Sequence, residues 1–208
     1  MTDDPHETLR ADEVLGPLVA EHGELALNPA EDLYRRLVVS ILRQQVSMAA
    51  AAATRRQLFD AVDPTPEAVL SADRETLREA GLSRQKIRYI REAARTVRER
   101  GYEKSTFADA TDEEIREALT AITGVGEWTA NMQLLFTFGR EDVFPVGDLG
   151  VRAGMAALFD VDREAREWMV EEAERWAPHR SYATLYLWRV EEDVVESVDE
   201  VIRARDAD

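Results

Sequence analysis

The stretch of sequence that decides the fold runs from Leu119 to Gly150, LTAITGVGEWTANMQLLFTFGREDVFPVGDLG. It predicts the end of one helix, a tight GVG turn, a second helix from about Trp128, a loop, and a third helix that opens at Asp148. Glycines lack a Cβ, so the turn can bend sharply and approach another surface closely. The unpaired N–H groups at the start of the following helix favour an anion such as a phosphate. A carboxylate placed to face the same ligand then indicates chemistry on nucleic acid.

The rest of the chain also has helical patterns. Over residues 31–46 apolar side chains recur at helical spacing, and the alanine-rich run after Ser47 favours a second helix. Ser47 and Thr65 are expected as N-caps, and Thr111 with Glu114 forms a capping box. Two further amphipathic segments are expected over residues 163–176 and from residue 181 to about residue 203. Because no segment alternates apolar and polar residues as a strand does, we predict an all-α fold.

Composition excludes several kinds of chemistry and location. The chain has 208 residues and no cysteine, which excludes disulfides, thiolate catalysis and cysteine-ligated metal sites. Its three histidines, His6, His22 and His179, do not have the spacing of metal ligands. No apolar run is long enough to span a membrane, and the polar, acidic N-terminus is unlike a signal peptide. We therefore expect a cytoplasmic protein without a membrane partner.

The net charge is unusual for a protein that would bind DNA. A formal charge of −16 opposes approach to a polyanion, and on its own it favours an acidic protein that never meets DNA. The only lysines are Lys86 and Lys104, and the other cations are arginines. An acidic, lysine-poor and cysteine-free composition resembles that of haloarchaeal proteins, so we expect a high-salt cytoplasm. Multimolar salt would screen the long-range repulsion, and binding would then depend on packing and short-range hydrogen bonds.

Five motifs resemble the helix-hairpin-helix (HhH-GPD) DNA glycosylase superfamily, and three of these point to its 3-methyladenine DNA glycosylase II branch. The hairpin motif is Ile122–Asn131, ITGVGEWTAN, and the loop that carries the family's catalytic aspartate is Pro145–Gly150, PVGDLG. The branch motifs are Ile41–Ser47 (ILRQQVS), Gly81–Ile87 (GLSRQKI) and Trp176–Ala183 (WAPHRSYA). A GVG hairpin alone is weakly specific because many DNA-binding proteins have one. Five motifs in the family's order make the resemblance specific.

The resemblance implies two helical subdomains that flank a DNA-binding cleft. One would be built from residues 1–35 and 145–208, and the other from residues 36–144, with the helix-hairpin-helix over residues 119–138. The branches of the superfamily that hold an iron–sulfur cluster use four cysteines for it, which this sequence lacks. Bacterial members of the alkylated-base branch often have an additional N-terminal α/β domain. The core motifs begin too close to Met1 for such a domain to be expected here.

The resemblance assigns Asp148 as the catalytic residue. In the family, the N-glycosidic bond of a flipped nucleotide is hydrolysed, and a carboxylate stabilises the oxocarbenium-like sugar or orients the attacking water. Alkylated purines such as 3-methyladenine and 7-methylguanine are cationic leaving groups, so a strong general acid is less necessary. The alternative for Asp148 is an ordinary N-cap of the helix LGVRAGMAALF, and one carboxylate can serve in both ways.

The resemblance also predicts a monofunctional enzyme. Bifunctional relatives carry a catalytic lysine two residues after the second hairpin glycine, where this chain has Trp128. We therefore expect no β-lyase activity. Trp128, Met132 and His179 are the candidate walls of the base pocket, and the first could stack on a cationic base. Relatives often have tryptophan at the position of His179, and some have an aromatic at that of Met132, so base selectivity is open. Trp128 could equally be a core residue.

A larger set of residues is expected to contact double-stranded DNA that contains a damaged base. The set is Gly124, Val125, Gly126 and Thr129 in the hairpin, Arg43, Gln44, Gln45 and Ser47 in the second motif, and Arg180 and Ser181 near the C-terminus. Gln45 falls on the family's wedge position, where it could fill the gap left by the flipped base. A polar helix end capped by Ser47 is the competing interpretation. For Tyr182, Leu185 and Trp188 the three-residue spacing favours a core stripe.

Other expectations concern ions, partners and rival functions. In the family the hairpin carbonyls often bind K+ or Na+, here at the backbone of Ile122 and Val125, and no other cofactor is expected. We expect a monomer. One rival function is the same fold acting on deaminated or mismatched bases, such as hypoxanthine or uracil. A second is a non-catalytic DNA-structure-binding protein, and a third is an acidic helical protein that binds other proteins.

Overall fold

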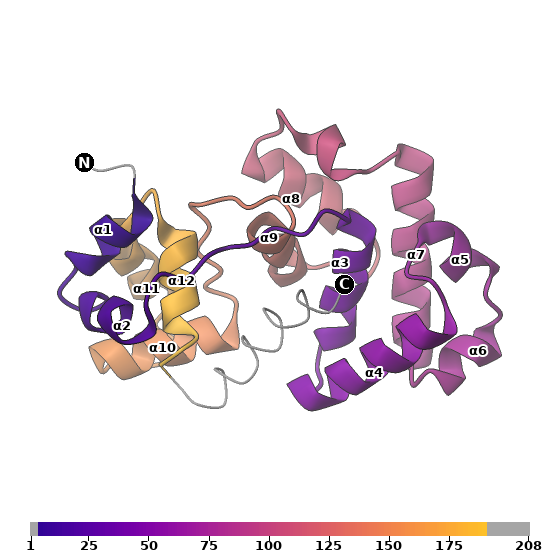
Figure 1. Cartoon of the computed structure of the whole chain (residues 1–208), viewed down its shortest axis with the longest axis horizontal. Helices are drawn as coiled ribbons and strands as arrows, with labels where there is room; N and C mark the ends of the chain where they lie inside the picture. The colour runs from indigo at the N-terminus through magenta and orange to yellow at the C-terminus, as the bar shows by residue number, and fades with distance from the viewer. Residues whose placement is uncertain (1–3, 191–208) are drawn as a thin grey trace. The chain divides into compact units, whose positions relative to one another are not determined.

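The computed structural model describes residues 4–190, which form two compact units. The N-terminal segment up to Asn28 and the chain from Gly139 onward form the first unit, and Pro29–Phe138 form the second (Figure 1). All regular structure in residues 4–190 is helical, which confirms the predicted fold class. No helix in this range is both long enough and apolar enough to cross a membrane.

The helices divide between the units as follows. The first unit contains α1 (Pro5–Arg10), α2 (Gly16–His22), α10 (Leu149–Phe159), α11 (Arg166–Ala173), the 3₁₀ turn η2 (Glu174–Trp176) and α12 (Arg180–Leu187). The second unit contains α3 (Leu33–Arg43), α4 (Met48–Ala61), α5 (Pro66–Ser71), α6 (Arg74–Glu79), α7 (Arg84–Arg100), η1 (Lys104–Phe107), α8 (Asp112–Thr120) and α9 (Glu127–Phe136). The sequence analysis places the same segments in the same order but divides them near residues 35 and 145.

The helix starts lie where short polar side chains can accept the first free N–H groups. Ser47, Thr65 and Ser83 each accept the backbone N–H three residues on, as N-caps of α4, α5 and α7. Thr111 and Glu114 form a reciprocal capping box at α8. Each such cap contributes about 1 kcal/mol to helix stability. The predicted starts at Ser47, Thr65 and Thr111 are therefore confirmed.

In the second unit α3 is the central helix. It packs against both α7 and α9, and its buried residues include polar groups that are hydrogen-bonded. The Tyr34 hydroxyl donates to the carbonyl of Ile90 at 3.1 Å, and the Gln133 amide donates to Ser40 Oγ at 2.9 Å. These contacts join α3 to α7 and to α9, and they fix the helices from which the hairpin and its neighbouring loop extend.

In the first unit α10 and α12 approach each other unusually closely. A Cβ added to Gly154 of α10 would overlap the backbone carbonyl of Leu187 in α12. The Tyr186 hydroxyl of α12 donates to the carbonyl of Gly23 at 2.8 Å, so the C-terminal and N-terminal parts of the chain share this core. The close contact of α10 with α12 brings the start of one helix beside the end of the other.

Two helix predictions near the C-terminus need correction. The helix expected over residues 163–176 begins at Arg166 and tightens into the 3₁₀ turn η2 after Ala173. The helix expected from residue 181 to about residue 203 ends at Leu187, because the next residues turn back on themselves with N–H groups of Arg189 and Val190 bonded three residues back. Residues 191–203 of that prediction lie outside the described residues.

Candidate active site and nucleic-acid interface

The hairpin turn is closed by a glycine that no other residue could replace without strain. Gly124 has φ +92°, and a Cβ built on it would lie only 2.2 Å from Cγ of the Tyr89 ring of α7. An L-residue rarely adopts this φ, and the ring leaves no space for a side chain. The turn therefore lies directly on the face of Tyr89. The sequence predicts the sharp turn at Gly124, but it gives no indication of the residue that it would contact.

Gly126 lies in a different environment. It is the N-cap of α9, with an extended backbone, and no atom lies within 4 Å of a Cβ placed there. No side chain caps the first turn of α9. The helix start is thus open to an approaching group, and its N–H groups suit an anion. Val125 is buried, and its N–H donates to the carbonyl of Ile122 at 3.0 Å. A monovalent cation at these carbonyls stays a prediction.

Gln44 supports the hairpin from α3. Its Nε2 donates to the carbonyl of Gly124 and to the hydroxyl of Thr129, both at 3.0 Å. Thr129 is buried, so its hydroxyl faces Gln44 inside the protein. The structure thus brings these two predicted DNA-contacting residues together as internal braces of the turn. Lys86 adds to the same region, because its ammonium group donates to the carbonyl of Leu42 near the end of α3.

The loop between α3 and α4 presents the residue predicted as the wedge. Gln45 is exposed and has φ +58°, a left-handed conformation that is unfavourable for a residue with a Cβ. Val46 beside it is 43% exposed, and Ser47 caps α4 through the N–H of Ala50 at 3.3 Å. Strain of this kind, held in place by its surroundings, is often found at functional positions. Arg43 precedes the loop and is half-buried.

In the first unit Asp148 is the N-cap of α10, and its carboxylate accepts hydrogen bonds from a backbone N–H and from an indole N–H. Its Oδ1 accepts the backbone N–H of Val151 at 3.0 Å, as the N-cap interpretation predicts. The same oxygen accepts the indole N–H of Trp188 at 2.8 Å. Asp148 is half-buried. The helix N-terminus and the indole together fix the orientation of a carboxylate that still reaches the surface.

Trp188 has a contact with Asp148 that its place in a core stripe does not predict. It is 6% exposed, as the predicted core stripe requires, but its N–H also serves Asp148. Gly150 makes room for it, because a Cβ there would lie 2.8 Å from Cδ1 of the indole and 3.2 Å from Oδ1 of Asp148. The glycine after the family aspartate was the available indication that a bulky group lies against this turn.

Arg180 and Ser181 hold the loop that leads to Asp148. The Arg180 guanidinium donates to both oxygens of Asp142, at 2.7 and 2.9 Å, and also pairs with Glu174. The Ser181 hydroxyl donates to the carbonyl of Arg140 at 2.6 Å and accepts the N–H of Val143 at 2.9 Å. Ser181 is fully buried. Both residues have a structural role in the free protein, and their DNA contacts stay predictions.

The three candidate pocket residues lie in different units. Trp128 and Met132 are in α9 of the second unit, where Trp128 is half-buried and Met132 is 3% exposed. His179 is in the first unit, 4% exposed, directly before α12. Its Nδ1 has no hydrogen-bond partner among residues 4–190, and the same is true of the Trp176 indole nitrogen. Residues 4–190 contain no group of three His, Asp or Glu side chains that could hold a metal ion.

Residues 38–179 match the HhH-GPD superfamily of base excision DNA repair proteins. The chain belongs to this superfamily. The HhH-GPD match contains the whole hairpin, the Asp148 loop and the segment up to His179. It confirms the family resemblance that the five motifs indicate.

Individual relatives agree with this assignment. The chain is 30% identical over 189 residues to Escherichia coli DNA-3-methyladenine glycosylase 2, which covers 85% of this chain and 64% of that protein. Several curated relatives are longer, so the chain spans less than two thirds of their length.

Two solved structures are similar over almost the whole chain. A DNA-3-methyladenine glycosidase from Bacillus halodurans has a TM-score of 0.78 and 33% identity, covering 97% of each chain. The 3-methyladenine DNA glycosylase Mag1 of Schizosaccharomyces pombe, in complex with abasic DNA, has a TM-score of 0.81 and 28% identity, covering 91% of this chain and 98% of that one.

Proposed function

We propose that this HhH-GPD protein is a monofunctional DNA glycosylase that hydrolyses the N-glycosidic bond of alkylated purines. The observation that carries the proposal is the carboxylate of Asp148, held by the start of α10 and by the Trp188 indole within the family loop. The similarity to proteins named DNA-3-methyladenine glycosylases supports alkylated bases as the substrate class. The substrate is double-stranded DNA that contains such a base.

Asp148 would act by electrostatic stabilisation. As the cationic base departs, positive charge develops on the sugar, and a fixed carboxylate stabilises it without having to reorient. The indole and the Val151 N–H both bind Oδ1. The carboxylate is therefore held in one orientation before the substrate arrives. A water molecule that attacks the sugar could be oriented by the same group.

The absence of lyase activity rests on the position of the two lysines. Trp128 occupies the position of the nucleophilic lysine of bifunctional relatives. Lys86 donates to the carbonyl of Leu42, and Lys104 donates to that of Ala30 at 3.3 Å, so both ammonium groups are bonded within the second unit. Without an amine at the hairpin no Schiff base with the sugar can form there, and abasic sites should stay uncut.

The test is release of free base from methylated duplex DNA in multimolar KCl. The wild type should release 3-methyladenine or 7-methylguanine and leave intact abasic sites, whereas Asp148→Asn should be slower by a factor of about 10² or more. Asp160→Asn is the matched control, since Asp160 is an exposed residue at the other end of α10. Release of hypoxanthine or uracil alone would instead indicate the deaminated-base alternative. DNA binding without release of any base would refute the proposal and indicate a DNA-structure-binding protein.

We further propose that the protein works in a high-salt cytoplasm. The composition supports this, with a net charge of −16 and only two lysines. Exposed acidic groups repel one another in dilute buffer, and salt screens this repulsion. The thermal midpoint of unfolding should therefore rise as KCl is raised into the multimolar range. A protein that is stable and active in dilute buffer but inhibited by multimolar KCl would contradict this proposal.

A further inference from the structure

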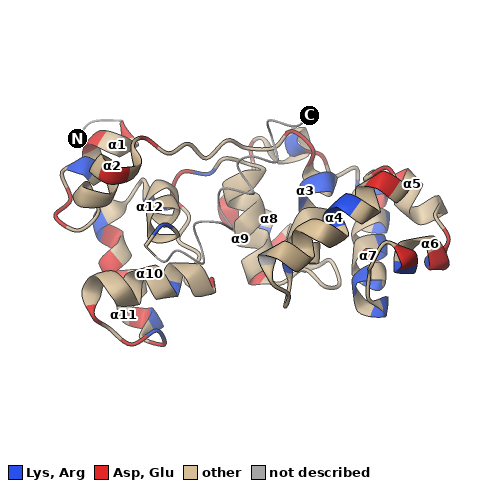
Figure 2. Cartoon of the chain, turned by 60° about the horizontal axis from the view of Figure 1, so that its bottom comes forward, with Lys and Arg blue, Asp and Glu red and all other residues tan. Residues whose placement is uncertain are grey.

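The acidic character of the chain does not extend to α3, α4 and α7 of the second unit. Between Leu33 and Phe59, which covers α3 and most of α4, the chain carries Arg35, Arg36, Arg43, Arg55 and Arg56 and no Asp or Glu. Between Gly81 and Gly101, which covers α7, it carries Arg84, Lys86, Arg88, Arg91, Arg95, Arg98 and Arg100 against Glu92 and Glu99. Figure 2 shows these cations along α7 and acidic residues on α5 and α6.

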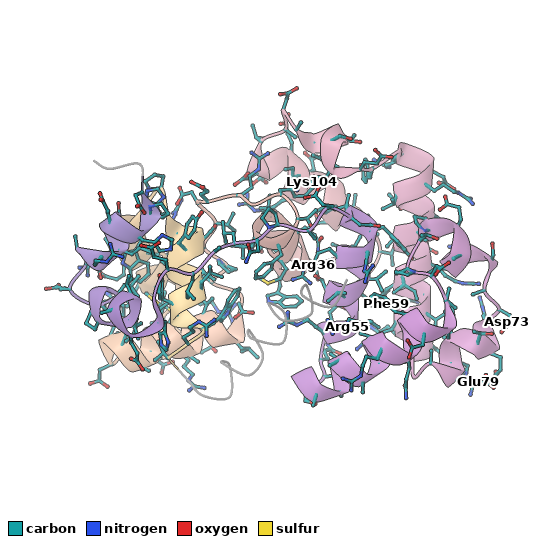
Figure 3. All side chains as sticks on the ribbon, viewed as in Figure 1. Arg36, Arg55, Phe59, Asp73, Glu79 and Lys104 are labelled. Carbon is teal, nitrogen blue, oxygen red and sulfur yellow. The ribbon has the colours of Figure 1, made fainter. Side chains whose placement is uncertain are left out.

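Most acidic residues of this unit lie on α5, α6, α8 and the loops between helices, and the exceptions are Asp60, Glu92, Glu99 and Glu127. Asp73 and Glu79, at the two ends of α6, are exposed and project outward at the edge of the unit in Figure 3. The second unit therefore separates its charges, with cations on α3, α4 and α7. Such a basic region on an acidic protein suits a polyanion.

Among the α7 arginines, only Arg95 has a carboxylate partner in residues 4–190. Arg95 pairs with Glu92, and Arg91 donates to the backbone carbonyls of Leu70 and Ala72. For Arg84 and Arg88, by contrast, no residue among 4–190 supplies a salt bridge, and both are exposed. The Arg88 guanidinium lies 5.3 Å from the centre of the Tyr89 ring. An aromatic contact orients the guanidinium but leaves its positive charge available to an anion.

The start of α7 contacts the hairpin, the end of α3 and helix α4. Tyr89 underlies the hairpin at Gly124, and Lys86 donates to Leu42 at the end of α3, two residues before Gln44. Gly81, just before α7, lies against α4, since a Cβ there would be 3.1 Å from Oε1 of Gln57. Arg84 and Arg88 thus lie on the first turns of a helix that contacts the hairpin, the end of α3 and α4.

We propose that Arg84 and Arg88 form a second phosphate-binding surface, which extends the grip of the hairpin along the DNA backbone. This inference rests on the proposed function only in requiring that the protein binds DNA. Residues four apart on a helix lie on one face with about 5–6 Å between their Cβ atoms. Guanidinium groups bind phosphates bidentately. Neither arginine has to break an ion pair first, whereas Arg180 would have to leave Asp142 and Glu174.

The experiment measures how DNA affinity depends on salt for R84Q/R88Q and for the control R74Q/R98Q. Arg74 and Arg98 are exposed arginines of the same unit, also without a salt bridge to residues 4–190, and both pairs change the net charge equally. Fluorescence anisotropy with a duplex that contains a tetrahydrofuran abasic analogue gives Kd over a KCl series. Each lost phosphate contact should lower the slope of log Kd against log salt by about 0.9. Circular dichroism verifies that each variant is folded.

We expect R84Q/R88Q to lose close to two such contacts and to bind at least about tenfold more weakly at the lowest salt, with the control close to wild type. Equal losses of DNA affinity in both variants would mean that only net charge matters, and they would refute the proposed phosphate-binding surface. An unchanged slope in R84Q/R88Q, or no binding by the wild type at any salt, would also overturn it. A wild type that binds with these slopes but releases no base would refute the glycosylase proposal and leave the surface intact.

Discussion

Replacing Trp188 with phenylalanine tests whether Asp148 depends on a tryptophan 40 positions later in the chain. The substitution removes the indole N–H that donates to Oδ1 at 2.8 Å and keeps an aromatic ring against Gly150. The Val151 N–H remains as the other donor. The carboxylate should therefore still cap α10 but should become free to turn away from its present orientation.

The expected magnitude follows from the burial of this contact. A hydrogen bond to a charged group contributes about 1.5–3 kcal/mol, and Trp188 is only 6% exposed, so solvent does not replace the lost donor easily. Together with the smaller ring, Trp188→Phe should lower the free energy of unfolding by about 2–4 kcal/mol. Because a carboxylate displaced by about 1 Å can cost about 10²-fold in rate, kcat should fall by about 10- to 10²-fold. DNA affinity should change little.

The assay is single-turnover release of alkylated base, measured for Trp188→Phe, Asp148→Asn and the double variant. If Trp188 acts by orienting Asp148, then adding Trp188→Phe to the Asp148→Asn variant should lower the rate of base release very little further. Trp176→Phe is the control for ring size, because the Trp176 indole is 1% exposed and its N–H has no partner among residues 4–190. That variant should lose stability without the loss in kcat. Fully multiplicative rate losses in the double variant would refute the reasoning, since Trp188 would then act independently of Asp148.

Three further changes test other parts of the structure. Gly124→Ala should lower the free energy of unfolding by at least about 2 kcal/mol and abolish DNA binding, because the added Cβ would overlap Tyr89. Gly126→Ala should lower the free energy of unfolding by only about 1 kcal/mol or less in denaturant titrations. Similar losses in the two variants would contradict the Tyr89 contact. Gln45→Gly should raise the free energy of unfolding by up to about 1 kcal/mol, because φ +58° suits glycine. Its affinity for the abasic duplex should fall, because the predicted wedge side chain is lost. Unchanged affinity would argue against a wedge role of Gln45. Ser181→Ala should lower the free energy of unfolding by about 1–3 kcal/mol, because it removes the hydroxyl that bonds to the Arg140 carbonyl and the Val143 N–H. Thermal melting will measure this loss. A loss of DNA affinity without a loss of stability would favour the DNA-contact interpretation.

Local features of the fold follow closely from the sequence. The caps at Ser47, Thr65 and Thr111 depend on side chains that bond to the backbone three residues away, so neighbouring residues suffice to predict them. Helix ends without such caps are harder to predict from the sequence. The last described helix stops at Leu187 although apolar periodicity continues and no Gly or Pro follows, so the neighbouring residues do not indicate its end.

The candidate site divides in the same way. The turn at Gly124 and the cap at Asp148 are encoded in consecutive residues, and both lie where the motifs predict. The partners that hold them, Tyr89 and Trp188, come from distant segments. Sequence spacing within one helix cannot reveal such long-range pairs, so Trp188 was assigned to the core alone. Gln44 shows the converse, since a residue expected to contact DNA also bonds to the hairpin, which its sequence position does not reveal.

The two ends of the described chain meet in the first unit, and this has a consequence for synthesis. Tyr186 bonds to Gly23, 163 positions earlier, so α1 and α2 leave the ribosome long before α12 exists to bury them. The second unit is continuous, and it can fold while the rest is still being made. The nascent chain would therefore complete its hairpin first. Asp148 would gain its indole partner only after Trp188 has been synthesised. A product terminated before Trp188 would therefore retain the hairpin but would lack an oriented carboxylate.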